Sequence, residues 1–198
     1  NLLTWVADGS EPPVSVFPRQ SDGTAATREA VALELDAIPA LVTPDPALLP
    51  SIYPLDLGPH ADQGVAQLPA DRNGASYPCV VSAVDADGNE IGGVRMPDVS
   101  VPVATYAGFN VRHKDSGGIG QILEYVGLTS PFAKDTEARK TNGDPRLSLA
   151  ERYPSRADYL GKIEAAAWDL VEARLLLAED VGLCLSLAGD RYDAIMEG

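Results

Sequence analysis

Nucleophilic catalysis by serine is the first chemistry to consider, because the chain holds twelve serines and two histidines. A serine presented on a sharp strand-to-helix turn needs the frame Gly-x-Ser-x-Gly, since only small neighbours fit so strained a turn. No serine in the sequence has this frame. The nearest match, Asp115-Ser116-Gly117-Gly118, lacks the glycine two residues before the serine. We therefore interpret Ser116 as a loop serine beside flexible glycines.

The two histidines, His60 and His113, have the chemistry of a general base. A general base needs a partner nucleophile within hydrogen-bond reach, and neither sequence context supplies one. We therefore expect both histidines on the surface. An independent hydrolase that combines one of them with an unrecognised serine is the least favoured of three functional hypotheses.

Metal and phosphate sites are not predicted either. Asp85-x-Asp87-x-Asn89 begins like a calcium-binding EF-hand loop, but Glu90 replaces the glycine and Met96 replaces the final glutamate. We interpret these residues as a hairpin turn. The run Ser116-Gly117-Gly118-Ile119-Gly120 matches neither the P-loop nor the dinucleotide-binding fingerprint. We expect no metal and no cofactor.

Composition excludes several classes of partner. The net charge of −14 would repel nucleic acid, whose binding needs Lys and Arg to neutralise phosphates. No apolar run approaches the roughly 18 residues that a membrane-spanning helix requires. Hydrophobic residues make up 45% of the chain, enough for a folded core. Cys79 and Cys184 lie among apolar neighbours and are expected to be buried free thiols, although one bridge between them stays open.

The elements that would position a site begin with residues 1–24. The apolar Leu2–Val6 stretch and Gly9 predict the last turns of an amphipathic helix with a glycine C-cap. A chain that opens inside a helix suggests a cut or truncated protein, with removal of a tag or a signal peptide as the alternative. A short strand is expected at Val14–Phe17.

The middle of the chain divides into two parts. Residues 25–76 show no sustained period and are punctuated by prolines, which predicts an irregular segment that wraps a surface or shapes a site. Residues 77–110 predict a β-hairpin, with strands Tyr77–Val84 and Ile91–Met96. Alternating apolar residues at Val99–Thr105 predict a further extended segment.

Residues 111–198 are predicted to be a glycine loop followed by helices. A short helix is expected near Gln121–Val126 and another at Asp135–Thr141. Ser148 and Glu151 fit a capping box. Apolar residues at helical spacing predict an antiparallel pair, Arg156–Leu175 and Leu176–Leu187. The chain is thus predicted to be mixed α/β with α+β character.

Several of these stretches together resemble a family of large bacterial α/β-hydrolase-domain proteins, of which this chain would be the last third. The resemblance covers most of the chain and is weakest over Ala25–Tyr77. Family members commonly have Trp where this chain has Phe109. The matching stretches are Leu2–Gly9 with Pro12–Ser15 and Asp22–Thr24, the block Val84–Val99 with Val101–Asn110, and Gly143–Arg146, Glu151–Tyr153 and Arg156–Leu160.

The resemblance implies an esterase-like hydrolase with a Ser–His–acid triad. Its nucleophile and catalytic histidine would lie upstream of Asn1, so no catalytic residue is assigned in this chain. The candidate pocket residues are Asp98, Tyr106, Phe109, Asn110 and His113. Equally open is that this block only packs the hairpin onto the hydrolase sheet.

The leading hypothesis is therefore the carboxyl-terminal part of an α/β-hydrolase. Its expected partners are the upstream hydrolase part, in the same precursor or as a second chain, and a small-molecule ester. The alternative from another class is a non-catalytic binding or assembly module.

Overall fold

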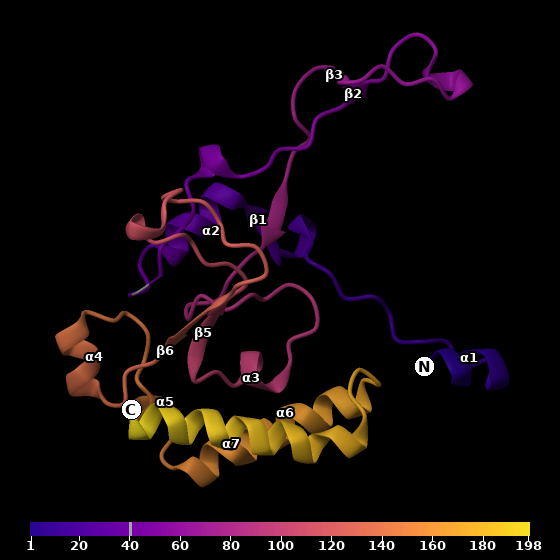
Figure 1. Ribbon diagram of the computed structural model, residues 1–198. Coiled ribbons are helices and arrows are strands. Elements are labelled where there is room, and N and C mark those ends of the chain that lie inside the picture. The colour runs from indigo at the N-terminus through magenta and orange to yellow at the C-terminus, as the bar shows by residue number, and fades with distance from the viewer. Residues whose placement is uncertain (40) are drawn as a thin grey trace.

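The computed structural model describes residues 1–39 and 41–198, and these have the predicted mixed α/β fold. The α-helices are α1 (Leu2–Asp8), α2 (Arg28–Leu35), α3 (Pro97–Ser100), α4 (Thr136–Asn142), α5 (Leu149–Arg152), α6 (Arg156–Glu172) and α7 (Val181–Glu197). The strands of the described residues pair antiparallel in twos: β1 (Ala25–Thr27) with β4 (Val80–Ser82), β2 (Leu55–Asp56) with β3 (Asp71–Arg72), and β5 (Ala104–Ala107) with β6 (Leu128–Pro131). Figure 1 shows the helical pair along one side of β5–β6, and the β2–β3 arm projecting at the other end.

The helices α6 and α7 form the predicted antiparallel pair (Figure 1). The hydroxyl of Ser155 accepts a hydrogen bond from the Asp158 N–H and so caps α6. The predicted boundary between the helices was wrong: α6 ends at Glu172 and α7 begins at Val181. The reason is Arg174, whose φ of 62° is incompatible with a right-handed helix.

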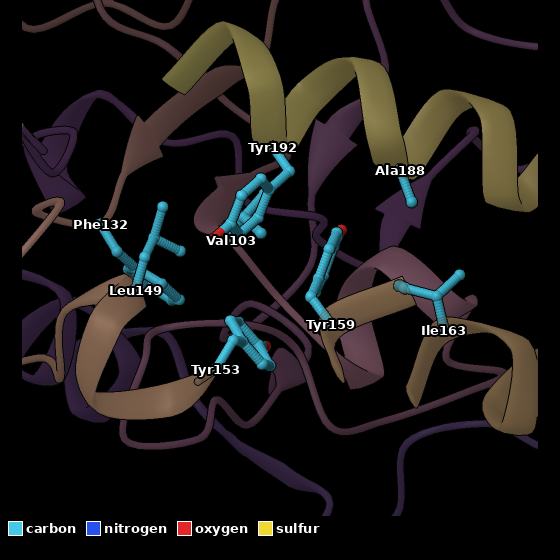
Figure 2. Close-up of a cluster of buried hydrophobic side chains, with 8 residues drawn as sticks. All are labelled: Val103, Phe132, Leu149, Tyr153, Tyr159, Ile163, Ala188 and Tyr192. Carbon is cyan, nitrogen blue, oxygen red and sulfur yellow. The ribbon is translucent and has the colours of Figure 1, made fainter. Parts of the chain in front are cut away.

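The main core lies between this pair and the β5–β6 sheet (Figure 2). Tyr159 is fully buried, and its ring centroid lies 5.0 Å from that of Tyr153 and 5.2 Å from that of Tyr192. Such tilted and stacked aromatic pairs contribute beyond the area they bury. The cluster comprises Val103, Phe132, Leu149, Tyr153, Tyr159, Ile163, Ala188 and Tyr192.

A second core lies around α2, within the segment that was predicted to be irregular. The Thr27 hydroxyl caps α2 by accepting a hydrogen bond from the Ala30 N–H at 3.3 Å. Val31 and Leu35 lie four residues apart, so both project from the same face. This face packs with Ile38 and Leu41 against residues of β4, β5 and β6. The expectation for residues 25–35 was therefore wrong, because a helix of only two turns shows little periodicity.

The predicted hairpin is present as a turn but not as two full strands. Val84 and Glu90 form an antiparallel bridge around the turn, and the Ile91 N–H donates to the Ala83 carbonyl at 2.9 Å. Beyond Ile91 the ladder stops at Gly92-Gly93, where Gly93 has a φ of 88°. The strand β4 pairs with β1 instead, with Ala26 opposite Val81.

Other short predicted elements are also absent from the described residues. The Val14–Phe17 stretch follows two prolines and has no strand partner. No helix forms near Gln121–Val126, because Ile122 bridges Val111 and Tyr125 has a φ of 59°. Part of the expected extended segment is instead α3, which starts with a proline at its first position.

A buried ion pair joins β5–β6 to the α4–α5 connection. The side chains of Arg146 and Asp144 are 1% and 6% exposed, and Arg146 Nη2 lies 2.7 Å from Asp144 Oδ2. Arg146 Nη1 also donates to Thr105 Oγ1 at 2.6 Å and to the Ser130 carbonyl at 2.9 Å. Burial alone would raise the pKa of Asp144, but the hydrogen bonds from Arg146 hold it below its usual value.

We expect Arg146→Ala to lower the free energy of unfolding by about 3–5 kcal/mol, because it leaves the Asp144 carboxylate buried without its partner. The matched control is Arg156→Ala, whose ion pair with Asp193 is about half exposed and should contribute under about 1 kcal/mol. Urea unfolding of both variants measures the difference. Equal losses would contradict the central role of Arg146.

The predicted capping box is present at α5. The Ser148 hydroxyl and its backbone N–H both donate to Glu151, and these bonds lower the pKa of Glu151 to about 2. A carboxyl with a lowered pKa stabilises the fold above its ordinary pKa of 4.5, and this contribution is lost as the pH falls toward 2.

Ser148→Ala should therefore return the pKa of Glu151 toward 4.5 and reduce the loss of stability between pH 4.5 and 2. Titration of the Glu151 carboxyl by NMR checks this. Ser155→Ala removes the cap of the next helix without contact to Glu151, so it should leave that pKa unchanged.

Candidate functional site

The turn at residues 85–90 is joined to β5 by hydrogen bonds of buried polar side chains. The Asp85 carboxylate accepts hydrogen bonds from the N–H groups of Asp87 and Asn89, both at 3.0 Å, and pairs with Arg95. Asn89 is fully buried; it donates to the Ala104 carbonyl at 3.0 Å and accepts from the Tyr106 N–H at 2.8 Å. The residues that resemble the start of an EF-hand thus brace a turn, as predicted.

Gly88 lets this turn approach the rest of the molecule. Its φ is 76°, and a Cβ built there would lie 2.2 Å from Ile38 and 3.0 Å from Thr105. Any other residue would collide with Ile38 of the core around α2 and crowd Thr105 of β5. Over the described residues, no group of His, Cys, Asp or Glu is arranged to hold a metal ion.

The candidate pocket residues do not converge on one site. Asp98, on α3, pairs with Arg191 of α7 at 3.2 Å and lines a hollow of about 410 Å³ between these helices. Tyr106 and Phe109 share the wall of a smaller hollow of about 210 Å³ beside α2. Asn110 closes the base of the following loop through its carbonyl, which accepts from the Leu123 N–H at 2.8 Å.

Cys79 and Cys184 are free thiols as predicted, but the prediction that both are buried was wrong, because Cys79 is exposed and Cys184 is only partly buried.

His113 and His60 are exposed, as expected. The Ser116 hydroxyl donates to the backbone carbonyl of His113 at 2.7 Å, so it is bound to the main chain and not to the imidazole ring. Asp115 lies 3.3 Å from the His113 ring, but both side chains are more than two-thirds exposed. This cluster therefore has no serine activated by a histidine base.

The pocket that sequence reasoning missed lies beside α2. It is apolar, has a volume of about 300 Å³, and is formed by four segments that are distant in the sequence. Phe109, a predicted pocket residue, is in its wall. No local pattern indicates such a pocket, because α2, the 43–50 segment, β4 and the 109–122 loop meet only in the folded chain. Its walls are Arg28, Val31, Ala32, Leu35, Thr43, Pro44, Pro46, Leu49, Pro50, Val81, Phe109 and Ile122.

Tyr106 has a buried hydroxyl that finds no hydrogen-bond partner among the described residues. Burial raises the pKa of this phenol, with the Arg191 cation opposing the shift, so the hydroxyl stays neutral. Tyr153 offers a matched comparison, because its buried hydroxyl has a hydrogen-bond partner: it donates to the Pro102 carbonyl at 2.7 Å.

Tyr106→Phe should therefore leave the free energy of unfolding unchanged or raise it by up to about 1 kcal/mol, since no bond is lost. Tyr153→Phe should lower it by about 1–2 kcal/mol, because a buried carbonyl loses its donor. Urea unfolding of the two variants checks the contrast. A similar loss at both positions would mean that the Tyr106 hydroxyl is paired.

Comparison with known proteins agrees with the resemblance noted from the sequence. A family model described as "Alpha/beta hydrolase domain" matches residues 1–185. Searches of the curated proteins and of the solved structures gave no match. None of the helices in the described residues is long and apolar enough to cross a membrane. The family match spans nearly the whole chain, and the chain therefore belongs to the alpha/beta hydrolase domain family.

Proposed function

We propose that this chain is the carboxyl-terminal part of an esterase-like α/β-hydrolase whose Ser–His–acid triad lies upstream of Asn1. One observation carries the proposal: a chain of this family has, in its described residues, only short antiparallel strand pairs. A nucleophile elbow stands at the end of a strand in a larger sheet, with a helix directly after it. Among the described strands only β1 leads directly into a helix, α2, but β1 belongs to a two-stranded sheet and no serine lies at its end. Neither histidine has a serine partner among the described residues.

The exposed apolar surface of α1 is evidence for a binding partner that completes the fold. Leu2, Leu3 and Val6 are 70%, 81% and 77% exposed, and α1 has no buried residue. Figure 1 shows α1 apart from the main body, beside the α6–α7 turn. Exposed apolar side chains gathered on one short helix are typical of an interaction surface. The proposed partner is the upstream hydrolase part, in the same precursor or as a second chain, and the proposed substrate is a small-molecule ester.

A serine-directed fluorophosphonate separates this proposal from an independent hydrolase. The 198-residue chain alone should show no labelling, whereas a protein that also contains the upstream part should be labelled once, at an upstream serine. Intact-mass and peptide analysis identify the modified residue. Labelling of a serine in this chain, abolished by His113→Ala or His60→Ala, would overturn the proposal.

A non-catalytic assembly module is the second candidate, and the β2–β3 arm favours it. The arm projects from the body (Figure 1), and its flanking residues Ile52 and Leu68 are 74% and 84% exposed. An assembly module binds its partner without affecting ester turnover. A catalytic part restores turnover when it is added to an inactive upstream part. Mixing the two parts and measuring ester turnover therefore decides between the two candidates.

A further inference from the structure

The pocket beside α2 has the walls of a site for a small apolar group. Its lining includes Val31 and Leu35 of α2, Pro44 and Leu49 of the following segment, and Phe109 of the loop after β5. Its volume is about 300 Å³, at the lower end of the range of small-molecule sites. With each non-hydrogen atom given the volume of a water molecule, about 30 Å³, the pocket holds roughly ten atoms.

One cation lies in this otherwise apolar wall. Arg28 is the first residue of α2 and is partly buried, and its Nη1 donates to the Pro50 carbonyl at 2.9 Å. That bond holds the guanidinium beside the pocket. The polar neighbour Thr43 already donates its hydroxyl to Asp36 at 2.6 Å.

We propose that this pocket binds an apolar monocarboxylate of about ten non-hydrogen atoms, with its carboxylate on Arg28 and its chain against α2 and Phe109. A guanidinium fork matches a carboxylate in shape and charge. Each methylene of the ligand that moves from water to the apolar wall makes the binding free energy more favourable. This binding site is a property of the described chain and is independent of where the hydrolase triad lies.

Isothermal titration of the 198-residue chain with straight-chain carboxylates, from butanoate to dodecanoate below their micelle concentrations, tests the proposal. Each added methylene should tighten binding about fourfold, up to a chain of about eight carbons, after which the gain should stop. Octan-1-ol, which has the same chain without the charge, should bind at least about tenfold more weakly than octanoate.

Two pairs of variants assign the contacts. Arg28→Gln should weaken octanoate about tenfold or more and leave octan-1-ol unchanged, whereas Arg112→Gln, at an exposed arginine outside the pocket wall, should change neither. Ala32→Leu should fill the pocket and abolish binding of both ligands. Ala30→Leu makes the same change on the exposed face of α2 and should have no effect.

Helix content and thermal unfolding of all four variants show whether each is folded, since every substitution is at a partly or fully exposed position. Binding that does not depend on chain length would overturn the proposal. So would equal affinity for octanoate and octan-1-ol, or a loss in Ala30→Leu as large as that in Ala32→Leu.

Discussion

The guanidinium of Arg146 is almost fully enclosed, and it satisfies polar groups from three separate parts of the chain. It pairs with Asp144, donates to the Thr105 hydroxyl, and donates to the Ser130 carbonyl. Thr105 in turn donates to the Asp87 carbonyl, so the 85–90 turn belongs to the same network. A buried charge is tolerated only when it is paired and hydrogen-bonded, and each of these contacts therefore depends on the others.

A second arginine extends this arrangement to the surface of the core. Arg152, at the end of α5, pairs with the Asp87 carboxylate and lies 4.2 Å over the ring of Phe132. The turn is thus fixed from one side by its own Asn89 and from the other by α5. The residues that resemble calcium ligands brace the turn, because Asp85 and Asp87 already have hydrogen-bond partners.

Local signals in the sequence predicted the caps and the helices that follow them. Ser148 with Glu151 lies at the capping box of α5, and Gly9 lies at the C-cap of α1. Non-local features were not predictable in this way. The pairing of β1 with β4 joins residues more than 50 positions apart, and nothing near Arg146 indicates that it is buried.

The same limit applies to the site. Phe109 was predicted as a pocket residue and lies in an apolar wall, but Arg28 and α2 came from a segment predicted to be irregular. The predicted residues Asp98 and Tyr106 line different hollows, which no local sequence pattern indicated. A pocket made from four distant segments exists only after the tertiary fold has formed.

The two hydrophobic clusters pack against opposite ends of one short strand pair, β5–β6. Val103 and Phe132 lie at one end of β5–β6, in the cluster of the helical pair, while Ala107 and Leu128 lie at the other end, against the α2 cluster. Separation of these strands removes a wall from both clusters at once. We therefore expect the two clusters to open as one cooperative unit, although one is built around α2 and the other around α6 and α7.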